Sequence, residues 1–122
     1  MKKAVIQNGI VITPFEMIKD VAVHMDDGII TGLSRSAETS ADEQVIDARG
    51  LYVCPGLIDI HTHGGGGSDF MDATDADFAQ AMRFHCSNGT TSLVATTVSA
   101  PDDQTSAMLE VVRRHKNKVL AG

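Results

Sequence analysis

The sequence predicts an α/β fold, with the N-terminal strands of a small β domain in residues 1–53 and the start of a second domain in residues 54–122. Two observations support this prediction. Short apolar runs separated by turn signals fill the first part, and the second part follows the order strand, helix, strand, helix and the start of a further strand. Because strands alternating with helices are typical of a parallel sheet, we expect the two parts to be different domains.

Two dipeptides in the first part favour tight hairpin turns. Asn8-Gly9 and Asp27-Gly28 each lie between apolar runs, and both sequences readily adopt the positive φ angles that such turns require. The first fifty residues therefore predict a small antiparallel β unit. His24 lies in an alternating apolar run before the second turn, so we expect its side chain to face solvent on a half-buried strand.

The pattern changes in the second part, where residues 57–63 predict a strand. Residues 74–89 then predict a helix, with Thr74 as its N-cap and Gly89 just beyond its C-terminus. One stripe of this helix is apolar enough to face a core, and the histidine within it is expected to be a hydrogen-bonded core residue. The stripe consists of Phe78, Ala81, Met82 and His85.

A second strand and a second helix follow. Residues 90–97 are rich in β-branched side chains and predict a strand, and a helix is expected after Pro101. The residues before Gly122 look like the beginning of a third strand. Because a parallel strand needs cover on both faces, which one β/α pair cannot provide, we expect the chain to be the first part of a longer protein.

The composition argues against several classes of function. The formal net charge is −6, and basic residues cluster only near the two ends of the chain, so nucleic acid is not an expected partner. No stretch approaches the ~18 continuous apolar residues of a membrane span, and the first residues lack the apolar region of a signal peptide. We therefore expect a cytoplasmic protein that contacts no membrane, with Cys54 and Cys86 reduced and buried.

Asp59, His61 and His63 occupy alternate positions at the end of the first predicted strand of the second part. Residues two apart in a strand share a face, with Cα atoms ~6.6 Å apart, so the two imidazoles can converge on one metal ion at ~2.0–2.1 Å. Histidines also serve as hydrogen-bonded structural residues. The carboxyl end of such a strand is where barrel enzymes assemble their active sites, so we predict that His61 and His63 are metal ligands.

Four consecutive glycines, Gly64 to Gly67, follow the two histidines. Glycine permits positive φ angles and close approach of the backbone to a ligand, but the same run also suits a flexible connection, and both interpretations stay open. The run lacks the G-x-G-x-x-G order of a dinucleotide site. We expect Asp69 and Asp72, and also His115 near a helix C-terminus, to be solvated surface residues.

The segment YVCPGLIDIHTHGGGGSDFMDAT, residues 52–74, resembles the start of the barrel in the amidohydrolase superfamily. Its glycine run and the following DFMD are similar to the N-acetylglucosamine-6-phosphate deacetylase family, and NGTTSLVATTVSAP, residues 88–101, resembles that family's second barrel strand. The resemblance implies the N-terminal strands of a small β-sandwich domain, followed by the first two β/α units of a metal-dependent (β/α)8 TIM barrel that is incomplete in this chain.

The resemblance also implies an activity. It is the metal-dependent hydrolysis of the acetamide of N-acetylglucosamine 6-phosphate, a small-molecule sugar phosphate, to glucosamine 6-phosphate and acetate. His61 and His63 match the superfamily's first-strand ligand pair for a divalent metal ion, with zinc expected first and iron, manganese, cobalt or nickel as alternatives. The family's catalytic Asp lies on a late strand, so no catalytic residue is expected within this chain, and its substrate-binding residues are unknown.

Two other functions are compatible with the sequence. Another amidohydrolase, acting on a cyclic amide such as a dihydropyrimidine, would share the first-strand motif, although HTHGGGGSDFMD, residues 61–72, favours the deacetylase. Alternatively, a non-catalytic module would self-associate through the unpaired edges of an incomplete parallel sheet. We expect a homo-oligomer that works as part of a longer enzyme, with the 122-residue chain inactive by itself.

Overall fold

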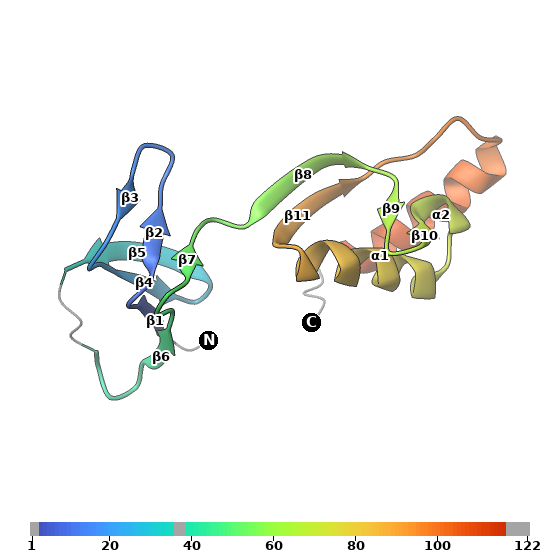
Figure 1. Ribbon diagram of the computed structural model, residues 1–122. Coiled ribbons are helices and arrows are strands. Elements are labelled where there is room, and N and C mark those ends of the chain that lie inside the picture. The colour runs from blue at the N-terminus through green and yellow to red at the C-terminus, as the bar shows by residue number, and fades with distance from the viewer. Residues whose placement is uncertain (1–2, 36–38, 117–122) are drawn as a thin grey trace. The chain divides into compact units, whose positions relative to one another are not determined.

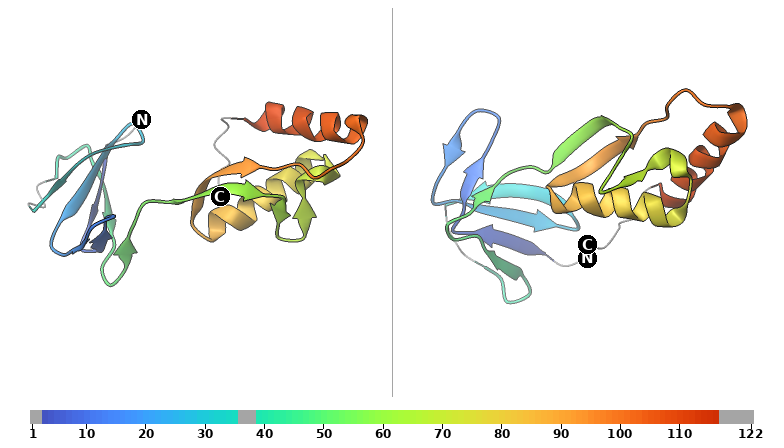
Figure 2. Two further views of the ribbon diagram at one scale, coloured as in Figure 1. Left: turned by 90° about the horizontal axis from the view of Figure 1, so that it is seen from above. Right: turned by 45° about the vertical axis from the view of Figure 1, so that its right-hand side comes forward.

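The computed structural model describes residues 3–35 and 39–116 (Figure 1). The protein is a mixed α/β chain with several small sheets, and it divides into two compact units, residues 1–55 and 56–122. Among the described residues, the first unit contains only strands, whereas both α-helices belong to the second (Figure 2).

The larger sheet of the first unit is built from β1 (Ala4–Gln7), β4 (Ala22–Asp26), β5 (Ile29–Ser34) and β6 (Gln44–Asp47). Its strand order is β5-β4-β1-β6. β4 pairs antiparallel with both β1 and β5, whereas β6 pairs parallel with β1. The apolar side chains of Val5, Ala22 and Val23 are buried, so the centre of this sheet contributes most of the small core of the first unit.

A smaller sheet of the first unit consists of β2 (Ile10–Ile12), β3 (Met17–Ile18) and β7 (Tyr52–Val53). β2 lies in the middle, antiparallel to β3 and parallel to β7 (Figure 1). Val11 on β2 is buried, but Phe15, between β2 and β3, is 95% exposed. The hairpin therefore presents a large apolar side chain to solvent.

The two predicted turns have different outcomes. Asp27 and Gly28, with φ angles of 50° and 79°, connect β4 to β5 as a hairpin, which confirms that prediction. The hairpin predicted at Asn8-Gly9 is wrong, because β1 and β2 belong to different sheets. The Asn8 amide donates to Asp47 Oδ1 at 2.8 Å, and a Cβ on Gly9 would lie 2.6 Å from a side chain of β7. These contacts turn the chain from one sheet into the other.

The prediction that His24 faces solvent is also wrong. Its side chain is only 24% exposed, with Nε2 2.7 Å from Ser34 Oγ and Nδ1 3.6 Å from Glu43 Oε1. Ser34 comes from the neighbouring strand and Glu43 from the segment just before β6. Polar partners on both ring nitrogens allow a histidine to sit in a partly buried position.

The second unit has the predicted order of strand, helix, strand and helix. Its parallel strands are β8 (Leu57–Thr62) and β11 (Thr90–Ala95), and its helices are α1 (Asp75–Ser87) and α2 (Asp102–His115). Between β8 and α1 the chain forms a short hairpin and one 3-10 turn. These elements are β9 (Gly64–Gly65), β10 (Ser68–Asp69) and η1 (Phe70–Asp72).

The core of the second unit is formed by the two helices and η1. Phe78 and Ala81 of the predicted α1 stripe are buried, as expected, and Leu93 and Ala95 of β11 pack against the cluster. The buried members are Phe70, Phe78, Ala81, Met108 and Val111. This core holds α1 and α2 on β11.

Helix α1 begins where its sequence predicts. Thr74 is the N-cap, and its Oγ1 accepts a hydrogen bond from the backbone N–H of Asp77 at 3.1 Å. Gly89, with a φ angle of 90°, follows the C-cap, so the positive φ expected after the helix is present. No described helix has the length and apolar character needed to cross a membrane.

The expected burial of the two cysteines is wrong. Cys54 and Cys86 are free and exposed, because Cys54 lies between β7 and β8 outside any strand or helix and Cys86 lies in the last turn of α1. Ile58 and Ile60 of β8 are also exposed, at 72% and 77%. The helices of this unit cover β11 rather than these two side chains.

Candidate metal site at the carboxyl end of β8

His61 and His63 lie at the carboxyl end of β8, His61 inside the strand and His63 directly after it. Their ring centroids are 5.1 Å apart, and the ring planes meet at 78°. Two imidazoles that bind one transition metal must be close neighbours without stacking face to face. The structure therefore brings the two predicted ligands together in an arrangement that is compatible with a shared ion.

The ring of His63 is oriented by the neighbouring strand. Its Nδ1 lies 3.1 Å from the backbone oxygen of Thr96, which directly follows β11. Because a carbonyl oxygen can only accept, Nδ1 must carry the proton in this bond, and the lone pair of Nε2 remains available to a metal ion. A hydrogen bond of this kind is the usual support for a metal-binding histidine.

The backbone of His63 is held as well as its ring. Its carbonyl oxygen accepts a hydrogen bond from the N–H of Phe70 at 2.7 Å, and the Phe70 side chain is 2% exposed in the core of the second unit. His63 is therefore connected through one backbone bond to the core of the second unit.

His61 is held less firmly. Its side chain is exposed, and the Asp59 carboxylate accepts a hydrogen bond from the His61 backbone N–H at 3.0 Å. Asp59 thus supports the local backbone. No group of three or more His, Cys, Asp or Glu residues within residues 3–35 and 39–116 could hold a metal ion, so His61 and His63 supply a pair of ligands.

The glycine run forms a tight hairpin against α1. Gly66 and Gly67, with φ angles of 64° and 91°, make the turn between β9 and β10, which non-glycine residues would resist. A Cβ on Gly65 would lie 2.6 Å from Phe84 Cδ1 and 3.0 Å from His85 Nε2. The glycine run is therefore a structured hairpin whose backbone lies close to helix α1, and a ligand beside this backbone stays a prediction.

Asp69 and Asp72, expected as solvated residues, cap the 3-10 turn that follows the hairpin. Asp69 Oδ1 accepts from the Met71 N–H at 2.8 Å, and Asp72 Oδ2 accepts from the Asp69 N–H at 2.9 Å. Ser68 also donates to Asp77 Oδ1 at 2.9 Å. Hydrogen bonds from the Thr74 hydroxyl and then from Ser68 lower the pKa of Asp77, so the hairpin and the start of α1 share one carboxylate.

The two remaining histidines of this unit have structural contacts. His85 is partly buried, with Nε2 3.0 Å from the Gly64 oxygen, which agrees with the predicted hydrogen-bonded core histidine. His115 is not the solvated residue expected, because its side chain is only 17% exposed. Its ring stacks on Phe78 with centroids 4.9 Å apart, and Nε2 lies 2.6 Å from Asp75 Oδ1.

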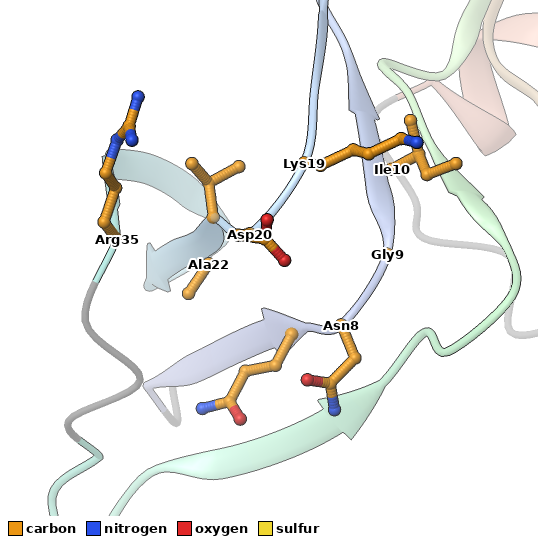
Figure 3. A pocket seen from close by; sticks show the side chains of 9 residues that line it. Asn8, Gly9, Ile10, Lys19, Asp20, Ala22 and Arg35 are labelled. Atoms are coloured by element: carbon orange, nitrogen blue, oxygen red, sulfur yellow. The ribbon is translucent and has the colours of Figure 1, made fainter.

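The first unit also contains a cavity of about 450 Å³, and Figure 3 shows the side chains that line it. Its charged lining residues are Lys19, Asp20 and Arg35, and the Asp20 carboxylate points into it. Sequence reasoning did not single out these residues, since they share no recognisable spacing. The cavity lining contains no histidine or cysteine, so it does not share the ligand types of the histidine pair in the second unit.

The chain is similar in sequence to known amide hydrolases. The chain is 30% identical over 119 residues to N-acetylglucosamine-6-phosphate deacetylase of Haemophilus influenzae, covering 97% of this chain and 31% of that protein. It is 44% identical over 61 residues to a dihydroorotase of Caldanaerobacter subterraneus, covering 50% of this chain and 14% of the relative. The chain thus spans about a third or less of the length of these curated relatives.

A solved structure shows the same fold. The crystal structure of N-acetylglucosamine-6-phosphate deacetylase from Pasteurella multocida superposes with a TM-score of 0.83 at 23% identity, covering 98% of this chain and 33% of that chain. The sequence profile described as the Amidohydrolase family matches residues 44–118, which is more than half of the 122 residues. The chain therefore belongs to the amidohydrolase family.

Proposed function

We propose that this chain forms the N-terminal part of a metal-dependent amide hydrolase. Residues 1–53 contribute strands to a small β-sandwich domain, and residues 54–122 form the first two β/α units of a (β/α)8 barrel. The parallel pairing of β8 with β11, each followed by a helix, supports this architecture. The protein is proposed to be cytoplasmic and homo-oligomeric.

The proposed reaction is hydrolysis of the acetamide of N-acetylglucosamine 6-phosphate to glucosamine 6-phosphate and acetate. One observation carries the proposal, namely that His61 and His63 are neighbours at a strand end, with His63 Nδ1 directed to the Thr96 oxygen. Similarity to the deacetylase of Haemophilus influenzae, at 30% identity over 97% of the chain, supports the choice of substrate. A dihydroorotase of Aquifex aeolicus also aligns over 96% of the chain, at 28% identity, so the cyclic-amide hydrolase is kept as the second candidate.

In this proposal, His61 and His63 hold a divalent metal ion, with zinc expected first and iron, manganese, cobalt or nickel as alternatives. A bound ion of this kind lowers the pKa of its water and polarises an amide carbonyl. The Thr96 oxygen keeps the His63 ring in the tautomer that offers Nε2. The carboxylate of Asp59 supports the His61 backbone and leaves its imidazole free.

The 122-residue chain is expected to show no turnover by itself. Hydrolytic metal sites use about three protein ligands plus a positioned acid or base, and the described residues supply two histidines without a third ligand. Sugar-phosphate assays of this purified chain should therefore give no release of acetate above the metal-only control. Robust metal-dependent turnover would contradict the proposal that the third metal ligand and the catalytic acid or base lie outside this chain.

Metal binding by the histidine pair can be tested directly. Co²⁺ titration followed by visible absorption should show nitrogen ligation in the wild-type chain and lose it in the His61→Ala/His63→Ala double variant. A matched control, His24→Ala/His115→Ala, removes the same number of imidazoles from other places in the fold. Equal loss of the Co²⁺ signal in both double variants would contradict a site at β8.

The substrate is tested with the protein as isolated from its source. Release of acetate from N-acetylglucosamine 6-phosphate, with no opening of dihydropyrimidine or dihydroorotate rings, is the expected result. Ring opening without deacetylation would instead support the cyclic-amide hydrolase, to which the similarity with dihydroorotase points.

The alternative of a self-associating module is tested by sedimentation. Such a module should form a defined oligomer that survives the His61→Ala/His63→Ala change, in a protein that shows neither deacetylation nor ring opening.

A further inference from the structure

A single nitrogen atom of His85 contacts the residues on both sides of His63. From helix α1, His85 Nε2 lies 3.0 Å from the Gly64 backbone oxygen and 3.3 Å from Thr62 Oγ1. Thr62 and Gly64 are the direct sequence neighbours of His63. His63, the proposed metal ligand, is therefore flanked by two residues that both contact the His85 imidazole.

These contacts require that the His85 ring carries a proton on Nε2. Gly64 O can only accept, so it accepts from His85 Nε2–H and also from the Thr62 hydroxyl, which lies 3.1 Å away. The close approach of the ring depends on a missing side chain, because a Cβ on Gly65 would lie 3.0 Å from His85 Nε2. The glycine hairpin thus allows the helix to reach the end of the strand.

The other side of the same segment is held by Thr96. The Thr62 oxygen accepts from the Thr96 N–H at 2.8 Å, and Thr96 Oγ1 accepts from the Thr62 N–H at 3.2 Å. The oxygen of Thr96 accepts from His63 Nδ1. Since the direction of the His63 ring follows from the backbone at Thr62 and Gly64, a shift of either residue would change the bond to Thr96.

We infer that His85 is a positioning residue for the metal-binding pair. It holds the Gly64 backbone oxygen and the Thr62 side-chain hydroxyl on the two sides of His63, so that the Nδ1 bond to Thr96 forms and Nε2 is left for the ion. This inference rests on the proposed function, because it assigns His85 a role at the same site. His85 is not assigned as a ligand, because its Nε2 is engaged by Gly64 and Thr62.

The first test uses the metal-free chain and reads the tautomer of His63 by imidazole ¹⁵N chemical shifts. His85→Phe keeps a ring beside Phe84 but removes the donor, whereas His85→Gln keeps an N–H donor. We expect the wild type and His85→Gln to show a single Nδ1–H tautomer for His63, and His85→Phe to show a mixture. An unchanged His63 tautomer in His85→Phe, or equal loss in both variants, would overturn the inference.

Two further variants separate positioning from stability. His115→Gln removes an imidazole that contacts Asp75 and Phe78, so it should lower stability and leave the His63 tautomer unchanged. Gly65→Ala keeps His85 but places a Cβ in its path, so it should reproduce the His85→Phe mixture even if His85→Phe itself folds poorly. A wild-type tautomer in folded Gly65→Ala would count against His85 as the positioning residue.

The second test measures Co²⁺ affinity of the same proteins. His85→Phe should weaken binding by about 10- to 100-fold, the usual effect of losing an outer-shell partner, while His85→Gln and His115→Gln should lose less than about tenfold. Absence of any Co²⁺ binding by the wild type would contradict the proposed function. The measurement of the His63 tautomer without metal would still decide the role of His85. Failure of the proposed function and failure of the inference about His85 can therefore be told apart.

Discussion

A phenylalanine in each unit, Phe70 in the second and Phe15 in the first, differs sharply in burial. Phe70 is 2% exposed in a core to which both helices contribute, whereas Phe15 is 95% exposed next to a two-stranded hairpin. The backbone N–H of Phe70 also donates to the His63 oxygen. In the second unit, packing and the candidate site are therefore linked through one residue, whereas Phe15 contributes almost nothing to the core of the first unit.

The largest expected effect comes from truncating the buried phenylalanine. Phe70→Ala should lower the free energy of unfolding of the second unit by about 3–5 kcal/mol, because it removes a large buried ring and leaves a cavity. Phe15→Ala, the matched change at an exposed position, should stay within about 0.5 kcal/mol of wild type. Urea denaturation followed by circular dichroism measures both.

The same pair of variants also tests the link to the site. Phe70→Ala should broaden the His63 imidazole signals even under conditions where the chain stays folded, since the backbone anchor of His63 moves with the core. Similar free energies of unfolding for both phenylalanine variants would mean that the two units do not differ in packing as described.

Two glycines give a second, smaller contrast between the units. Gly65→Ala should destabilise by about 1–3 kcal/mol, because overpacking forces the hairpin away from α1, where the new Cβ would meet Phe84 at 2.6 Å. Gly32 of β5 has open space around its Cβ position, so Gly32→Ala should be neutral or stabilising by up to about 1 kcal/mol. Thermal unfolding of both variants checks the sign, and a destabilising Gly32→Ala would contradict it.

Sequence reasoning succeeded where neighbouring residues decide the outcome. The start of α1 at Thr74 and the hairpin at Asp27-Gly28 follow from local turn and capping chemistry, and both are present. The pairing of His61 with His63 on one strand end also follows from a two-residue spacing. Period and propensity are properties of a short segment, so they are visible without the fold.

The remaining features depend on residues far apart in the chain. Asn8-Gly9 has a strong hairpin signal, yet the turn joins two sheets because Asp47 and a side chain of β7 meet it there. The bond from His63 to Thr96 joins residues that are 33 apart in sequence. Such contacts arise from tertiary packing, for which one sequence carries no periodic signal, so the partners of the candidate ligands could not be predicted.

Helix capping gives a third and smaller effect. Thr74→Ala should cost about 1 kcal/mol, because the N–H of Asp77 loses its side-chain acceptor at the start of α1. Thr74→Ser should restore most of this stability by keeping the hydroxyl. Helix α2 has no side-chain cap at Pro101, so the effect is specific to α1. Urea titrations of the two Thr74 variants measure it, and equal stability of both would argue against capping.

The smallest expected effect concerns a feature that the two units share. Each has an exposed carboxylate that joins segments about forty residues apart in sequence, Asp47 bonded to Asn8 and Asp75 bonded to His115 and Arg114. Hydrogen bonds from His115 first and then Arg114 lower the pKa of Asp75 below 3.8, and a hydrogen bond from Asn8 lowers that of Asp47. Because both groups face water, each contribution is small.

The sign of the pH dependence follows from these lowered pKa values. A carboxyl group that binds its proton less tightly in the folded state stabilises the fold above its unfolded pKa of 3.8, and this stabilisation is lost as the pH falls through the lower folded value. Asp75→Asn should therefore flatten the acid limb of stability in the second unit and Asp47→Asn that in the first. Carboxyl ¹³C titration measures both pKa values directly. A value at or above 3.8 for Asp75 would mean that the contact between the start of α1 and the end of α2 does not form in solution, and the two helices would then be joined without this ion pair.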